Sequence, residues 1–163
     1  MTLPLQPDFP SEGRLAGIDF GTVRIGVALT DATQKWPSPW ENYNRKDLAS
    51  DLAWFQKLVQ DERIVGLVIG LPVHTSGQES QKSQQVRAFA RWLQAGTGLP
   101  IRLFDERYSS SQAQELLLSA GYSKKSRQER LDKLAAQIIL AAFLESDRTQ
   151  QQALPLEDQP SQI

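Results

Sequence analysis

Three acidic residues stand where predicted strands or helices begin or end, each beside apolar neighbours. They are Asp19, Glu106 and Asp132. An ionised carboxylate next to a core is costly unless a cation or hydrogen bonds compensate its charge. Because the three acids are far apart in the sequence and similarly placed, we predict that they form one site. Carboxylates are hard oxygen ligands, so this site suits a hard divalent cation.

Alternating apolar patterns predict the elements that must position these acids. Two β-prone runs joined by a short turn, 14–20 and 24–30, indicate a hairpin, and 36–43 indicates a third strand at a sheet edge. Further strands are expected at 64–69 and 101–104. Helices are expected from Asn44 or Asp47 to about Asp61, and at 80–95, 110–120 and 128–145. This order predicts an α/β fold with a mixed five-stranded sheet and helices on both faces. Ligands of open α/β sheets sit at the carboxyl ends of strands, near Asp19 and Glu106.

Two helices carry more detailed expectations. The apolar face of the first helix is expected to consist of Leu48, Leu52, Phe55 and Leu58. The second helix is expected to end at Gly96, because glycine is the usual residue just past a helix.

Length and composition predict one soluble domain. The chain has 163 residues, 40% hydrophobic and 23% charged, with a domain expected at 13–146 between flexible tails at 1–12 and 147–163. Cysteine is absent and His74 is the single histidine, which excludes thiolate and histidine-rich metal sites. No apolar run approaches the ~20 residues of a membrane span, and no signal peptide is evident. We therefore expect a cytoplasmic protein without membrane contact.

The charge distribution bears on nucleic-acid binding. A net charge of −1 argues mildly against it. However, Lys124, Lys125 and Arg127 form a basic cluster shortly before Asp132. This cluster is either a solvated surface run or a set of contacts to a phosphate backbone beside the metal site.

The remaining motifs each allow a structural and a functional interpretation. Asp19-x-Gly21-Thr22 could be an ordinary turn capped by its Asp, or a turn whose glycine lets the backbone approach a phosphate. The loop from Gly70 through Pro72 to Gly77 could offer backbone amides to phosphate oxygens. His74, within it, is expected to be a surface contact rather than a catalytic base.

The acidic pair after the last predicted strand is ambiguous. Successive strand residues point to opposite faces, so only one of Asp105 and Glu106 can face the site if the strand persists. Arg107 could neutralise either acid in a simple strand-end ion pair, or bind phosphate.

Taken in order, these motifs resemble the YqgF family, the pre-16S rRNA nucleases also described as Holliday junction resolvase-like proteins. The resemblance covers about residues 14–145 and includes Asp19-x-Gly-Thr-x-Arg-Ile-Gly-Val-Ala, Gly70-Leu-Pro, Asp105-Glu-Arg and Asp132-Lys-Leu-Ala-Ala. It implies an RNase H-like three-layer fold in which Asp19, Glu106 and Asp132 are the catalytic acids. The family's loop usually continues with Asn and Asp-Gly, whereas this chain has His74 and Ser76-Gly77.

The resemblance implies a hydrolase, a metal-dependent endonuclease that processes the 5′ end of pre-16S rRNA in ribosome biogenesis. Mg²⁺ or Mn²⁺ would be held by the three acids, with Asp19 bridging two ions ~4 Å apart. Residues expected to contact nucleic acid are Thr22, Arg24, Arg107, Lys124, Lys125 and Arg127. The partner is expected to be RNA, or branched DNA, and the protein a monomer or weak homodimer. Alternative functions are a Holliday junction resolvase, a phosphotransferase or ATPase, and a non-catalytic nucleic-acid-binding factor.

Overall fold

The computed structural model describes residues 9–72, 80–105 and 124–146, with side chains of the last segment described from Asp132 onward. The described elements are β1 (Arg14–Asp19), β2 (Arg24–Thr30), β3 (Pro37–Asn44), α1 (Leu48–Asp61), β4 (Ile64–Leu71), α2 (Gln81–Thr97), β5 (Ile101–Asp105) and α4 (Lys124–Glu145). The helix expected at 110–120 lies outside the described residues.

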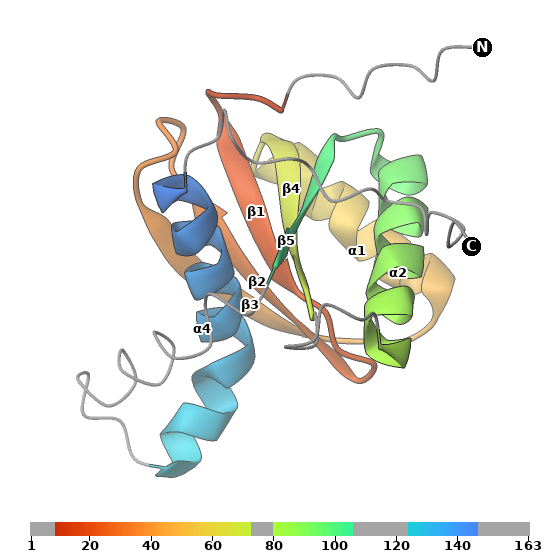
Figure 1. Ribbon diagram of the computed structural model, residues 1–163. Helices are drawn as coiled ribbons and strands as arrows, with labels where there is room; N and C mark the ends of the chain where they lie inside the picture. The colour runs from red at the N-terminus through yellow and green to blue at the C-terminus, as the bar shows by residue number, and fades with distance from the viewer. Residues whose placement is uncertain (1–8, 73–79, 106–123, 147–163) are drawn as a thin grey trace, which may run out of the picture.

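The five strands form one mixed sheet in the order β3-β2-β1-β4-β5 (Figure 1). The first two strands form the expected antiparallel hairpin, and β3 pairs with β2 at the sheet edge. The strands β1, β4 and β5 run parallel to one another. The predicted mixed five-stranded sheet and its edge strand are therefore confirmed.

Helices cover both faces of the sheet, as predicted: α4 lies on one face, and α1 and α2 lie on the other (Figure 1). The core on the α1/α2 face includes Phe55, Val86, Phe89 and Leu93, which pack against strand residues. The core on the α4 face is smaller and includes Leu15, Ala28, Val68, Ile139 and Leu140. A strand between two such layers is buried on both sides, which explains the continuous apolar sequence of β4.

The apolar face predicted for α1 was wrong at its start. Leu48, the first residue of the helix, is 62% exposed, whereas Asp51 is only 1% exposed. Asp47 caps the helix by accepting a hydrogen bond from the Ser50 amide at 2.8 Å. Periodicity alone placed the leucine inside, because it could not reveal which polar residue has partners that allow its burial.

The predicted end of α2 was also wrong. The helix continues to Thr97, and Gly98 takes a left-handed conformation (φ +72°) and donates its amide to the Gln94 carbonyl. Gly96 lies inside the helix, at a position where a Cβ would collide with the Leu52 side chain. This glycine therefore serves the close packing of α2 against α1.

The segment before β1 contacts the core from Phe9 onward. The ring of Phe9 lies edge-on to Phe143 of α4, with 5.4 Å between centroids. The Pro10 carbonyl accepts a hydrogen bond from the Gln34 side chain at 3.1 Å. Within the described ranges, no helix is both long and apolar enough to cross a membrane.

Candidate active site at the carboxyl end of the sheet

Asp19 is the last residue of β1 and lies on the sheet face that α4 covers. Its cross-strand partner is Gly26, and Gly17 precedes it by two residues. A Cβ on Gly26 would collide with the Asp132 carbonyl oxygen, and one on Gly17 would lie 2.8 Å from the Ala136 carbonyl oxygen. Because opposite residues in a strand pair share a face, as do residues two apart, Asp19 shares this face.

The close approach of α4 depends on small residues in both layers. Asp132 is followed by the small residues Ala135 and Ala136, and Ala136 is fully buried in this interface. Gly17 and Gly26 are the matching features of the sheet, which sequence reasoning did not identify. Because the Asp132 backbone rests on the strand partner of Asp19, two acids 113 positions apart in the numbering (132 − 19) meet at one end of the sheet.

Asp132 is paired with a cation from the sheet. The Arg24 Nε donates to its Oδ2 at 3.1 Å, and the Arg24 side chain is 55% exposed. The sequence has no lysine or arginine at positions 135 and 136, one helical turn after Asp132, and the partner comes instead from the start of β2. Exposed ion pairs contribute at most about 1 kcal/mol, so this pair can exchange easily for a stronger cation.

The register of β5 bears on the ambiguous acidic pair. Leu103 belongs to the core on the α1/α2 face, whereas Phe104 packs toward α4 and lies 6.4 Å from the Phe143 ring. Alternation therefore places Asp105 on the face opposite Asp19. Within the described ranges, no three Asp, Glu, His or Cys side chains form a metal site. The described structure thus brings together two of the three predicted acids.

The end of β4 lies beside Asp19. Ile18 pairs with Ile69, so Gly70 occupies the level of Asp19 on the neighbouring strand. A side chain at position 70 would share the α4 face with Val68. Glycine at this position adds no side chain to that face, and Pro72 follows directly after the strand ends.

The structure places two of the remaining predicted site residues, Thr22 and Arg24, which are exposed at the β1–β2 turn. The remainder lie outside the described residues or have side chains outside them: Gly77, Glu106, Arg107, Lys124, Lys125 and Arg127.

A buried polar network supports the turn that follows Asp19. The Asp51 carboxylate accepts hydrogen bonds from the Tyr43 hydroxyl (2.8 Å), the Lys46 amide (2.9 Å) and the Arg45 Nε (3.1 Å). Arg45 also donates to the Gly21 carbonyl at 3.4 Å, and its guanidinium lies 5.4 Å from the centroid of the Phe20 ring. The network therefore connects α1 to the backbone just beyond Asp19. Its only sequence signal is a polar residue, Asp51, inside an apolar helical stripe.

The network shifts the pKa values of two of its members. Burial, together with the hydrogen bond to Asp51, raises the pKa of Tyr43 to about 12. Burial alone would raise the pKa of Asp51, but the Lys46 amide, the Tyr43 hydroxyl and Arg45 outweigh it and lower this pKa. The carboxylate is therefore ionised, and the phenol protonated, over the whole physiological range.

The sheet order and the helical layers define an RNase H-like fold. Two solved structures share this fold. Thermus thermophilus RuvC in complex with a Holliday junction has a TM-score of 0.53 at 14% identity, covering 80% of this chain and 95% of that one. The fowlpox virus resolvase with its Holliday junction DNA has a TM-score of 0.52 at 9% identity, covering 81% of this chain and 97% of that one.

Sequence comparison gives the family. The family model described as "RuvX: Holliday junction resolvase" matches residues 13–146. A protein of Rhodopirellula baltica is 43% identical over 147 residues, covering 90% of this chain and 85% of its own length. A protein of Sphingopyxis alaskensis is 43% identical over 144 residues, covering 86% of this chain and 94% of its own length. Both are named "Putative pre-16S rRNA nuclease". The chain belongs to the RuvX family, the YqgF family that its motifs resemble.

Proposed function

We propose that this protein is an endonuclease that hydrolyses phosphodiester bonds in structured RNA, acting at the 5′ end of pre-16S rRNA. One observation carries the proposal: α4 rests its Asp132 backbone on Gly26, the strand partner of Asp19. Two acids are thereby gathered at the carboxyl end of a strand, where α/β proteins bind ligands. The names of relatives 43% identical over most of the chain support the RNA substrate.

The donor set fits a divalent cation. Carboxylate oxygens are the preferred ligands of Mg²⁺ and suit Mn²⁺ equally. Asp19, Asp132 and Glu106 would hold the cation, and Glu106 is favoured over Asp105 because Asp105 occupies the opposite sheet face. When bound, the cation would supply an activated water and neutralise charge on the phosphate.

The chain's own cations would orient the substrate. Arg24 lies beside Asp132 with its side chain 55% exposed, so it could release the carboxylate to the metal and turn toward a substrate phosphate. A bidentate guanidinium suits phosphate geometry. Thr22 at the neighbouring turn would assist. We assign further backbone contacts to Arg107, Lys124, Lys125 and Arg127, and the loop contacts to Gly70, Pro72 and Gly77.

The proposal also covers the extent of the domain, its location in the cell and its oligomeric state. A nuclease domain over 13–146 agrees in extent with the family match. We place it in the cytoplasm, where ribosomal RNA is processed, as a monomer or weak homodimer.

A Holliday junction resolvase is the second candidate, favoured by the description of the family model. The two activities share their chemistry and differ in substrate geometry. Junction cutting requires two sites related by a twofold axis, and therefore a dimer.

The test is cleavage of end-labelled precursor 16S rRNA and a four-way DNA junction with Mg²⁺, Mn²⁺ or EDTA. Metal-dependent cutting of the RNA that is lost in Asp19→Asn supports the proposal. Cutting of the junction alone, with a dimeric protein, would replace it by the resolvase. Nucleic-acid binding without cutting of either substrate, or of precursor ribosomal particles, would favour a binding factor.

A further inference from the structure

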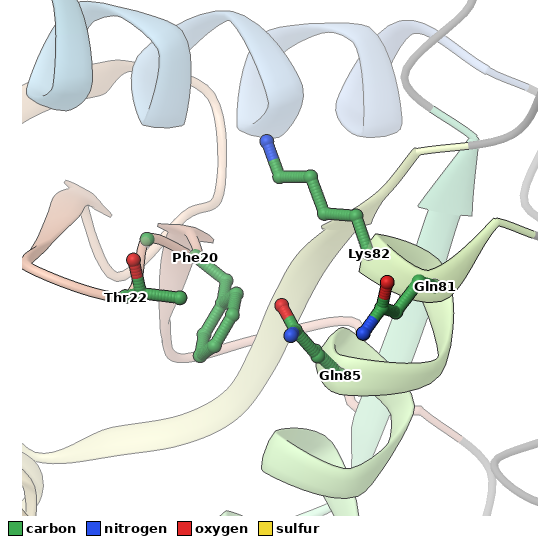
Figure 2. Close-up of a pocket in the computed structure, with 6 residues that line it drawn as sticks. Phe20, Thr22, Gln81, Lys82 and Gln85 are labelled. Carbon is green, nitrogen blue, oxygen red and sulfur yellow. The ribbon is translucent and has the colours of Figure 1, made fainter.

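A pocket of about 410 Å³ lies immediately beyond Asp19 in the chain (Figure 2). One wall is the β1–β2 turn and the other is the first two turns of α2. Among the described residues, those that line it are Phe20, Gly21, Thr22, Gln81, Lys82 and Gln85. Its volume falls within the roughly 300–1,000 Å³ typical of small-ligand sites.

The wall of the pocket next to Asp19 is held in place from behind. Phe20 is only 8% exposed, and its ring packs against Phe89 with 4.8 Å between centroids. Arg45 supports the same ring and the Gly21 carbonyl. The turn is therefore braced, and the pocket keeps a defined distance from the end of β1.

The polar groups of the pocket suit one nucleotide. Gln81 and Gln85 carry carboxamides, which present a donor and an acceptor together, as the edges of nucleobases do. Lys82 adds a positive charge, and Figure 2 shows its side chain extending from α2 toward α4. None of the described residues that line the pocket is acidic.

We propose that this pocket binds the nucleotide next to the cleaved bond of the RNA strand. Gln81 and Gln85 hydrogen-bond to the base edge, and Lys82 pairs with a phosphate. The inference rests on the proposed function, because the adjacent phosphate of such a strand would lie toward Asp19. The pocket would then select the base beside the cut, whereas the acids perform the hydrolysis.

The test is binding of a fluorescent single-stranded oligoribonucleotide in EDTA, followed by anisotropy. The pocket variants are Gln81→Ala/Gln85→Ala and Lys82→Gln, all at exposed positions where folding is not at risk. Gln84→Ala is the matched control on α2, since Gln84 is exposed and does not line the pocket. Lys57→Gln on α1, with a 76% exposed side chain, is the charge control.

The carboxamide double variant should bind about tenfold more weakly and lose its base preference, as expected for lost base-edge contacts. Lys82→Gln should flatten the dependence of log affinity on log salt by about 0.7, the value of one phosphate contact on a single strand. Both controls should match the parent. Pocket variants that bind like the controls would overturn the inference, as would pocket-dependent binding of the deoxyribonucleotide strand alone.

The outcomes separate this inference from the proposed function. If Asp19→Asn abolishes RNA cutting while the pocket variants keep their affinity and cut site, the pocket assignment fails and the nuclease stands. If the pocket variants lose binding but the parent cuts no RNA, the nucleotide site stands and the nuclease fails.

Discussion

Replacing Asp51 by Ala is predicted to be among the most destabilising single substitutions at a charged residue. Asp51 is 1% exposed and accepts hydrogen bonds from the Tyr43 hydroxyl, the Lys46 amide and the Arg45 guanidinium. Alanine leaves these three donors without this acceptor and leaves a largely buried arginine without its counter-ion.

Breaking a buried ion pair from one side costs about 3–5 kcal/mol. That is a large share of the ~5–15 kcal/mol that stabilises a typical domain. Asp61→Ala is the control in the same helix. Its partner Lys57 lies 3.3 Å away with both side chains largely exposed, so the loss should stay below about 1 kcal/mol.

Urea unfolding measures the difference. Trp54, one of four tryptophans, stacks on Tyr43 with 4.4 Å between ring centroids, so its contribution to the fluorescence reports on the network. The lowered pKa of Asp51 means that its contribution is present above its unfolded value of 3.8 and is lost as pH falls below it. Asp51→Ala should therefore lose stability near neutrality and show a weaker acid dependence. A loss no larger than that of Asp61→Ala would refute the reasoning.

Three further predictions concern the same end of the molecule. Because the pKa of Tyr43 is raised from 10.0 to about 12, the free energy of unfolding should fall as pH rises between these values. Tyr43→Phe should remove that fall, and it should also remove a phenol titration at high pH from the ultraviolet spectrum. Arg24→Gln should strengthen Mn²⁺ binding a few-fold, as measured by calorimetry, because it removes the cation that competes with the metal for Asp132. An unchanged affinity would show that Arg24 does not compete with the metal. Gly26→Ala should lower the free energy of unfolding by roughly 1–3 kcal/mol and weaken Mn²⁺ binding, because its Cβ would collide with the Asp132 backbone. A variant that unfolds at the parent's urea midpoint would contradict this packing.

The sheet was largely predictable because its signals are local. Two β-prone runs joined by a short turn indicated the hairpin, and the run at 36–43 indicated the edge strand. The unbroken apolar run of β4 matches its burial on both faces. The errors in the helices arose where contacts between residues in different parts of the fold determine which helix residues are buried. Asp51 can be buried because Tyr43 and Arg45 donate hydrogen bonds to it. Gly96 lies within α2 at a position where Leu52 of α1 leaves no room for a side chain.

The site was predictable to a similar degree. Motif order predicted that Asp19 and Asp132 belong to one site, and the structure places both acids at the same end of the sheet. The Arg24–Asp132 pair spans 108 positions and leaves no local pattern. The pocket likewise joins a turn to a helix some 60 residues away, and its glutamines look like ordinary surface residues in the sequence.

The most direct test is the single-turnover rate of precursor 16S rRNA cleavage for Asp19→Asn, Asp132→Asn and Asp105→Asn. Changing even an outer partner of a metal ligand costs about 10–100-fold, so direct ligands should cost at least about a hundredfold. We predict that loss for Asp19→Asn and Asp132→Asn. Asp105→Asn, on the opposite face of the sheet, should stay near the parent rate. Parent-like cutting by Asp132→Asn, or an equal loss in Asp105→Asn, would contradict a site built between α4 and the end of β1.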